Sequence, residues 1–346
     1  MLGGGVFVTQ NKVLPGSYIN IVSTATVTSA LGERGVVAVA LPIGKTAGKV
    51  FELTANDFVQ NCKTILGVEY SDKSVIALRE IFRHARKVYL YDLGKGELKT
   101  VANACSAFEP YEFNTICAYT NVSGDISTYV TQIKTWRDEM GKKCQLVVYN
   151  NTADYEGVIN VVSTVSDSDA DAWGLVAWVA GAQAGCAVNE SCTNMAYDGE
   201  YTIVVDKTQA QLEACLKAGQ FAFHNVYGSV RVLEDINSLT TTSADKGDDF
   251  KSNQTMRVVD QIANDIAKLF NTKYLGKIPN NASGRVSLWG DIVAHHREME
   301  RIQAIENFDS STLTVEQGAT KKAVVVNDVV TPTNCMAQLY MTIVVQ

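Results

Sequence analysis

Two glycine-lysine patterns are candidates for phosphate binding. The run Gly44-Lys45-Thr46 has the order in which a phosphate-binding loop ends, where backbone N–H groups surround the phosphate oxygens. Such a loop also needs a glycine five positions before Gly44, and Val39 occupies that position. The second run, Gly94-Lys95-Gly96, lacks the third glycine and the helix start of a dinucleotide site. The sequence therefore predicts no nucleotide site, and a turn at residues 94–96.

Histidines and nucleophiles are too dispersed to predict a metal site or a catalytic group. The chain has four histidines, of which only His295 and His296 are adjacent. Successive helical residues point about 100° apart, so this pair cannot hold one ion as residues four apart do. His295 falls on an apolar helix face, which predicts a hydrogen-bonded core histidine. Since no nucleophile signature is present either, we predict no catalytic, cofactor-binding or metal-binding residue.

Other clusters have structural explanations. Asp167, Asp169 and Asp171 precede an Ala/Gly-rich helix, whose dipole favours carboxylates at its start. Gly181 and Gly185 lie one turn apart on that helix and predict a close approach to its sheet. The eight cysteines form no CxxC pair, and the first residues lack the basic and apolar parts of a signal peptide. We therefore expect free core thiols and no secretion.

Length and composition limit the architecture and the function classes. The 346 residues suffice for two or three domains at about 100 to 200 residues each. The net charge is −7, with no long basic run, which argues against binding of nucleic acid or anionic lipid. The most apolar stretch, residues 173–188, is shorter than the roughly 20 residues that span a bilayer. We therefore expect no membrane insertion.

Hydrophobic patterning predicts a mixed α/β chain. A Val/Ala-rich run at residues 32–43 is typical of a buried strand, and strands alternate with helices from there to about residue 235. Expected strands cover residues 87–91, 115–119, 145–149, 157–162 and 201–205, a hairpin covers 220–234, and helices cover 72–85, 125–140, 169–186 and 208–217. In the final third, two amphipathic helices at about 248–272 and 284–305 should pack on a sheet built from residues 312–315, 323–330 and 340–346.

Both ends of the sequence contain apolar, strand-like runs. A strand without a partner leaves backbone N–H and C=O groups unpaired, which compact monomers avoid. Exchange of both ends with neighbouring copies would pair these groups by β-augmentation, and such head-to-tail links build rings or helical filaments. The candidate residues are Tyr18, Ile19, Asn20, Ile21 and Val22 in the first run, and Leu339, Tyr340, Met341, Thr342, Ile343, Val344 and Val345 in the second.

Several segments carry a resemblance to a known family. They read FVTQNKVLPGSYINIVS, LGERGVVAVALPIG, WVAGAQAGCAVNES, DINSLTT with DDFKSNQTMRVVDQIANDIAKLFNTKYLGK, and AQLYMTIVVQ. Together they run the whole length and resemble the tail sheath protein of contractile phages, in the short form of phages and phage-tail-like bacteriocins of Gram-positive bacteria. The resemblance implies a multi-domain sheath fold, with an N-terminal arm at 1–22, an outer domain at 23–95, a middle α/β domain at 96–235, an inner-wall domain at 236–338 and a C-terminal arm at 339–346.

The resemblance also implies a structural, force-generating subunit that is not an enzyme and needs no cofactor. Copies would polymerise as stacked rings around an inner tail tube protein, together with baseplate and tail terminator proteins, and contraction would drive the tube through the target envelope. The particle would be a virion tail or a tail-like particle assembled in the bacterial host cytoplasm. Arg297 and Arg301 would face the tube, or else pair locally with Glu298, Glu300 or Glu306.

Two other function classes stay open. A static tube or surface-layer protein would exchange strands in the same way without contracting. An α/β enzyme acting on a small ligand is suggested only by the alternation of strands and helices in the middle of the chain. Fold class alone does not confer an activity, and no catalytic constellation accompanies the alternation.

Overall fold

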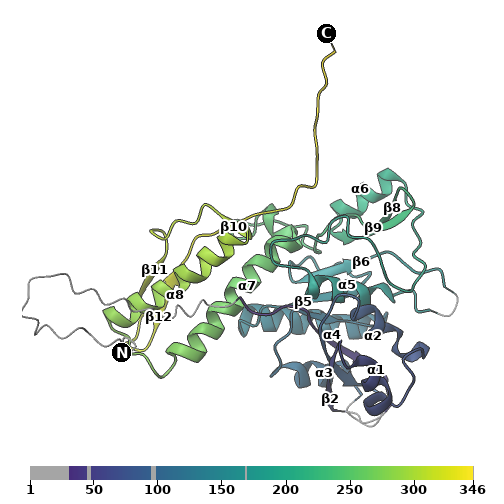
Figure 1. Cartoon of the computed structure of the whole chain (residues 1–346), viewed down its shortest axis with the longest axis horizontal. Helices are drawn as coiled ribbons and strands as arrows, with labels where there is room; N and C mark the ends of the chain where they lie inside the picture. The colour runs from purple at the N-terminus through teal and green to yellow at the C-terminus, as the bar shows by residue number, and fades with distance from the viewer. Residues whose placement is uncertain (1–30, 45–47, 95–98, 168–169, 346) are drawn as a thin grey trace, which may run out of the picture.

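A computed structural model describes residues 31–44, 48–94, 99–167 and 170–345. These residues form an α/β body, from which two long helices and a C-terminal segment extend (Figure 1). The strands are β1 (Val36–Leu41), β2 (Val50–Thr54), β3 (Lys87–Asp92), β4 (Thr115–Cys117), β5 (Gln145–Tyr149), β6 (Val158–Val161), β7 (Gln220–Phe221), β8 (Phe223–Val226), β9 (Ser229–Val232), β10 (Ile305–Glu306), β11 (Thr314–Gln317), β12 (Val324–Asn327) and β13 (Thr331–Pro332). The α-helices are α1 (Phe58–Asn61), α2 (Ile76–Ile81), α3 (Val101–Phe108), α4 (Ser123–Lys134), α5 (Leu175–Gly185), α6 (Gln209–Lys217), α7 (Asn253–Leu269) and α8 (Ala282–Arg301).

The body is built on a seven-stranded sheet in the order β2-β3-β1-β4-β5-β6-β7. Neighbouring strands run parallel, except that β2 is antiparallel to β3. All six residues of β1 are buried, as expected for a central strand with helices on both faces. The predictions of a buried strand in this run and of a mixed α/β fold are confirmed. The expected boundary between an outer domain and a middle domain, at residues 95/96, passes through this sheet, because β1 to β3 precede it and β4 to β7 follow it.

Successive side chains of β1 point to opposite faces of the sheet and enter two different cores. Val37 and Val39 pack with residues of α2 and α5. Val36 and Ala38 pack with residues of α3 and α4 on the other face. Because a strand alternates its side chains, this arrangement makes the body a three-layer, doubly wound α/β unit.

Helix α5 lies unusually close to its neighbour. A Cβ atom at Gly181 would come within 2.3 Å of the Ile81 carbonyl oxygen, and one at Gly185 within 2.2 Å of the His84 carbonyl oxygen. A close approach is therefore present, but the predicted partner was wrong, because the tight contacts are with the end of α2 and the turn after it and not with the sheet. The spacing of two glycines one helical turn apart predicts a close contact, but it does not identify the neighbouring element.

The two long helices carry the C-terminal part of the chain. Residues in the first half of α7 are buried in the α/β body, while its second half extends outward beside α8 (Figure 1). Helix α8 packs against the hairpin β11–β12, and the Trp289 Nε1–H donates to the Leu313 carbonyl at 3.0 Å. The predicted helices are confirmed. The predicted supporting sheet is smaller than expected, because β11 and β12 pair only with each other among the described residues. The prediction of a third strand at 340–346 was wrong for residues 340–345, which extend away from the hairpin without forming a strand.

Two local predictions differ from the structure. Residues 201–205 form one antiparallel bridge, Ile203 with Val165, because no strand in the described ranges offers them a longer ladder. Helix α3 was not expected, although Thr100 caps it by accepting from the Asn103 N–H at 3.2 Å. The predicted hairpin is present as β8–β9. In the described ranges, no helix combines the length and apolar character needed to cross a membrane.

Candidate subunit interface

The C-terminal segment extends from the body into solvent (Figure 1). Residues 336–345 belong to no helix or strand and have no ladder partner within the part of the chain that the structure describes. Their large apolar side chains are exposed, from 72% at Met341 to 102% at Met336. A contiguous apolar run of this kind typically marks an interaction surface. The predicted arm residues Leu339 to Val345 thus stand together in solvent, whereas Tyr18 to Val22 lie outside the described residues.

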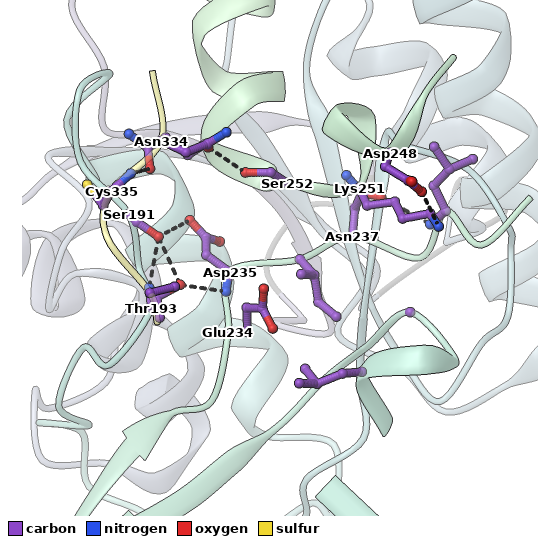
Figure 2. A pocket seen from close by; sticks show the side chains of 16 residues that line it. Ser191, Thr193, Glu234, Asp235, Asn237, Asp248, Lys251, Ser252, Asn334 and Cys335 are labelled. Carbon is purple, nitrogen blue, oxygen red and sulfur yellow. Dashed lines mark hydrogen bonds and ion pairs between the residues drawn. The ribbon is translucent and has the colours of Figure 1, made fainter. Parts of the chain in front are cut away.

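The start of this segment is held by the first turn of α7, beside a pocket of about 440 Å³ (Figure 2). The Asn334 carboxamide oxygen accepts from the Ser252 hydroxyl at 3.0 Å, and its Nδ2 donates to the Thr255 hydroxyl at 3.2 Å. The Cys335 N–H donates to Gln254 Oε1 at 2.9 Å. These bonds fix residues 334–335 on the helix start, so the free segment begins just beyond them.

A buried ion pair adjoins this pocket, which Asp235 helps to line. Arg257 Nη2 of α7 donates to Asp235 Oδ2 at 3.1 Å, and both side chains are almost fully buried. The Asp235 carboxylate also accepts from the Cys192 N–H at 3.0 Å and from Asn253 Nδ2 at 3.0 Å. Burial alone would raise the pKa of Asp235, but Arg257 and these hydrogen bonds lower it below its ordinary value. The site is therefore a charged structural junction between α7 and the α/β body.

The sequence gives no single signal for this junction. Asp235, Asn253 and Arg257 are ordinary polar residues when each is considered alone, and the ion pair joins positions 22 residues apart. They do fall in two of the segments that carry the family resemblance. A polar residue at an otherwise apolar helix position, such as Arg257, is the feature that could have indicated a buried partner.

The hairpin β11–β12 offers a second interaction feature. Its register pairs Thr314 with Asn327 and Gln317 with Val324, and neither outer edge pairs with another described strand. Val325 and Val326 are exposed at 45% and 38%. An open edge presents unpaired N–H and C=O groups, so it is a ready acceptor for one more strand.

The two arginines expected to face a tube lie near the end of α8 and are exposed. Arg301 Nη2 is 2.6 Å from Glu298 Oε1, which is the local pairing kept open as the alternative. Glu300 instead accepts from the Phe308 N–H at 3.1 Å. No ion pair of Arg297 occurs among the described residues. The tube-facing role of both residues stays a prediction.

The phosphate-like run and the histidines have structural roles. The Asp92 carboxylate accepts from the Gly44 N–H at 2.9 Å and from the Gly94 N–H at 2.7 Å, so a side-chain anion already occupies these donors. His295 is buried and lies 3.0 Å from Asp265, which confirms the prediction of a hydrogen-bonded core histidine. Over the described ranges, no group of three or more His, Cys, Asp or Glu side chains could hold a metal ion.

Comparison with known proteins gives consistent matches. The family model for the phage tail sheath protein central domain matches residues 96–238, and that for the phage tail sheath C-terminal domain matches residues 245–346. The tail sheath protein of Clostridium phage phiCD119 is 29% identical over 219 residues, which cover 62% of this chain and 60% of the phage protein. The sheath tail protein of Desulfitobacterium hafniense superposes with a TM-score of 0.78 at 28% identity, over 92% of this chain and 96% of that one. The helical sheath of the anti-feeding prophage in its contracted state has a TM-score of 0.73 at 15% identity, over 96% and 99% of the two chains, which is a likeness of fold alone.

Proposed function

The chain belongs to the family of contractile tail sheath proteins, which are structural subunits of phage tails and related injection systems. From this premise we propose that it polymerises by exchanging its terminal segments between copies. The observation that carries the proposal is the exposed apolar run at residues 339–345, which has no ladder partner in the described chain. The open edges of β11–β12 supply a matching acceptor. Residues 18–22 would supply the second exchanged strand.

The energy of one such link follows from ordinary sheet physics. Each backbone hydrogen bond contributes a net stabilisation of roughly 0.5 to 1.5 kcal/mol. Alternate side chains of the added strand bury apolar area as well, at about 25 cal/mol per Å². A link of six or seven residues therefore stabilises the polymer by several kcal/mol. Because many links act together, a modest gain per subunit suffices to drive a change of the whole lattice.

We propose that contraction moves the body as a rigid unit while the exchanged strands keep copies joined. The buried Arg257–Asp235 pair supports this, because it fixes α7 to the α/β body and leaves the segments beyond residue 335 free to act as hinges. The polymer would surround an inner tail tube and be bounded by baseplate and terminator proteins. Assembly would take place in the host cytoplasm, and no catalytic step or cofactor is required.

Electron microscopy of the purified protein tests this proposal. Strand exchange predicts long hollow helical polymers, while discrete small oligomers would contradict it. Particles with two lattice lengths, one extended and one shortened, are expected for a contractile sheath. A single lattice length under every triggering condition would instead assign the chain to the static tube class.

A further inference from the structure

Two adjacent histidines of α8 connect α7 with the residue that directly follows β12. His295 Nε2 lies 3.0 Å from Asp265 Oδ2 of α7. His296 Nε2 lies 2.7 Å from Asp328 Oδ2, directly after β12. The two Nδ1 atoms lie 3.3 Å apart. Both histidines are buried, at 1% and 0% exposure, so these contacts replace water as their polar partners.

The chain of contacts continues from Asp265 to the beginning of the described chain. Asp265 Oδ1 accepts from the Gly32 N–H at 3.0 Å, and Gln261 Nε2 donates to the Gly32 carbonyl at 3.2 Å. A Cβ atom at Gly32 would come within 2.5 Å of Asp265 Oδ1, so only glycine fits here without movement. One hydrogen-bonded path thus runs from Gly32, near the start of the described chain, to Asp328, which directly follows β12.

The protons in this path can be counted. An ionised carboxylate only accepts, so each Nε2 must carry a hydrogen to bond its aspartate. The Nδ1 contact needs one hydrogen, shared between two nitrogens. All three bonds therefore require three hydrogens on four ring nitrogens, which is one imidazolium beside one neutral imidazole. We propose that His295 and His296 share one extra proton and so form a single proton-binding site that links Asp328 to α7. The link loosens when a fourth hydrogen is added and both rings become imidazolium ions.

Acid breaks this link for a geometric reason. A fourth hydrogen would place two N–H groups head to head across the Nδ1 contact and set two positive rings side by side. The charged groups within hydrogen-bonding distance are Asp265 from α7 and Asp328 after β12, and the ring of Phe308 covers His296 at 4.9 Å between centroids. This inference concerns one folded copy and does not depend on polymerisation.

Nitrogen-15 NMR of histidine-labelled wild-type protein tests the proton count directly. At about pH 7.5, the His295 and His296 rings should show three protonated nitrogens and one bare nitrogen. Two bare nitrogens would mean two neutral rings, and none would mean two imidazolium ions. Either result would overturn the proposal, and neither depends on a variant that folds.

Hydrogen exchange tests the consequence. In wild type, amides of residues 324–332 should exchange roughly tenfold faster at about pH 5 than at about pH 7.5, after correction for intrinsic rates. Asp328→Ala, a change at the more exposed end of the path, should give the fast rate at both pH values. His84→Asn, which alters a half-buried histidine paired with Asp198 and outside this path, should behave as wild type. Equal wild-type protection at both pH values, or the same acid response in Asp328→Ala, would refute the link.

Discussion

The Arg137 guanidinium forms a bidentate ion pair with the Asp260 carboxylate, in which Nη1 donates to Oδ2 at 2.6 Å and Nη2 donates to Oδ1 at 2.8 Å. Arg137 lies in the turn after α4, and Asp260 lies in the first half of α7. The side chains are only 3% and 8% exposed. Burial would lower the pKa of Arg137, but Asp260 more than reverses this and keeps the guanidinium charged. With Arg257–Asp235, this pair fastens α7 to the α/β body at two places.

Removal of one partner of this pair should destabilise the fold strongly. Asp260→Ala leaves Arg137 charged, buried and uncompensated, so we expect a loss of about 3 to 5 kcal/mol in the free energy of unfolding. Urea denaturation measures this loss. The double variant Arg137→Met with Asp260→Leu should recover much of it, because it removes both charges.

The matched control for this prediction is Glu298→Ala. Glu298 pairs with Arg301 on the exposed surface of α8. Solvent screens such pairs, so the midpoint of unfolding should stay close to that of wild type. If Glu298→Ala and Asp260→Ala lowered the free energy of unfolding equally, burial of the ion pair would not be the cause of the loss.

Assembly should depend on backbone hydrogen bonds of the C-terminal segment. Ile343→Pro removes one ladder donor while the side chain stays apolar, so we expect a folded, soluble protein that forms no polymer. Circular dichroism and sedimentation measure folding and assembly separately. Ile343→Val is the control, since it keeps the N–H and should assemble normally. Normal polymers from Ile343→Pro would refute the role assigned to this segment.

Stability should fall in acid partly through Asp235. Its pKa is lowered in the folded protein, so the stabilisation it contributes is present above the unfolded value of about 3.9 and is lost as the pH falls through the folded value. Asp235→Asn should be less stable than wild type at neutral pH, and the difference should shrink below about pH 4. Urea unfolding across this range checks it. A constant difference at every pH would contradict the assignment.

The contact between α5 and α2 should not tolerate a methyl group. Gly181→Ala places a Cβ 2.3 Å from the Ile81 carbonyl oxygen, so we expect a loss of stability of about 1 to 3 kcal/mol. Gly124→Ala in α4 is the control, because a Cβ there meets nothing within 4 Å. Alanine is the better helix former, so the control should be neutral or stabilising. The melting temperatures of both variants, measured by thermal unfolding, test this prediction. Equal melting temperatures would contradict it.

Local patterns predicted most of the elements. The continuous apolar run of β1 and the helical spacing of residues 125–140 each contain their own signal, and both elements are present. The helix at Val101–Phe108 was missed although its cap and apolar spacing are in the sequence. Residues 201–205 show the opposite error, since strand propensity produces a ladder only where a partner strand is available.

Long-range partners were not predictable in this way. Arg137 and Asp260 are 123 residues apart, and neither carries a local sign of the other. The role of His295 was predicted from its helix face, but its aspartate partner came only with the tertiary structure. The exposed run at residues 339–345 was recognisable from its apolar pattern, and its proposed acceptor was not, because an open strand edge depends on how β11 and β12 pair.

Helix α7 has one half inside the body and one half outside it. Its 17 residues make a rod about 25 Å long. Because the inner half is held by two ion pairs, the part of α7 beyond Asp260 is about 13 Å long, and a tilt of the body by about ten degrees about these pairs would move the outer end by about 2 Å. The displacement that such a tilt produces would therefore grow along α7 with distance from the two ion pairs.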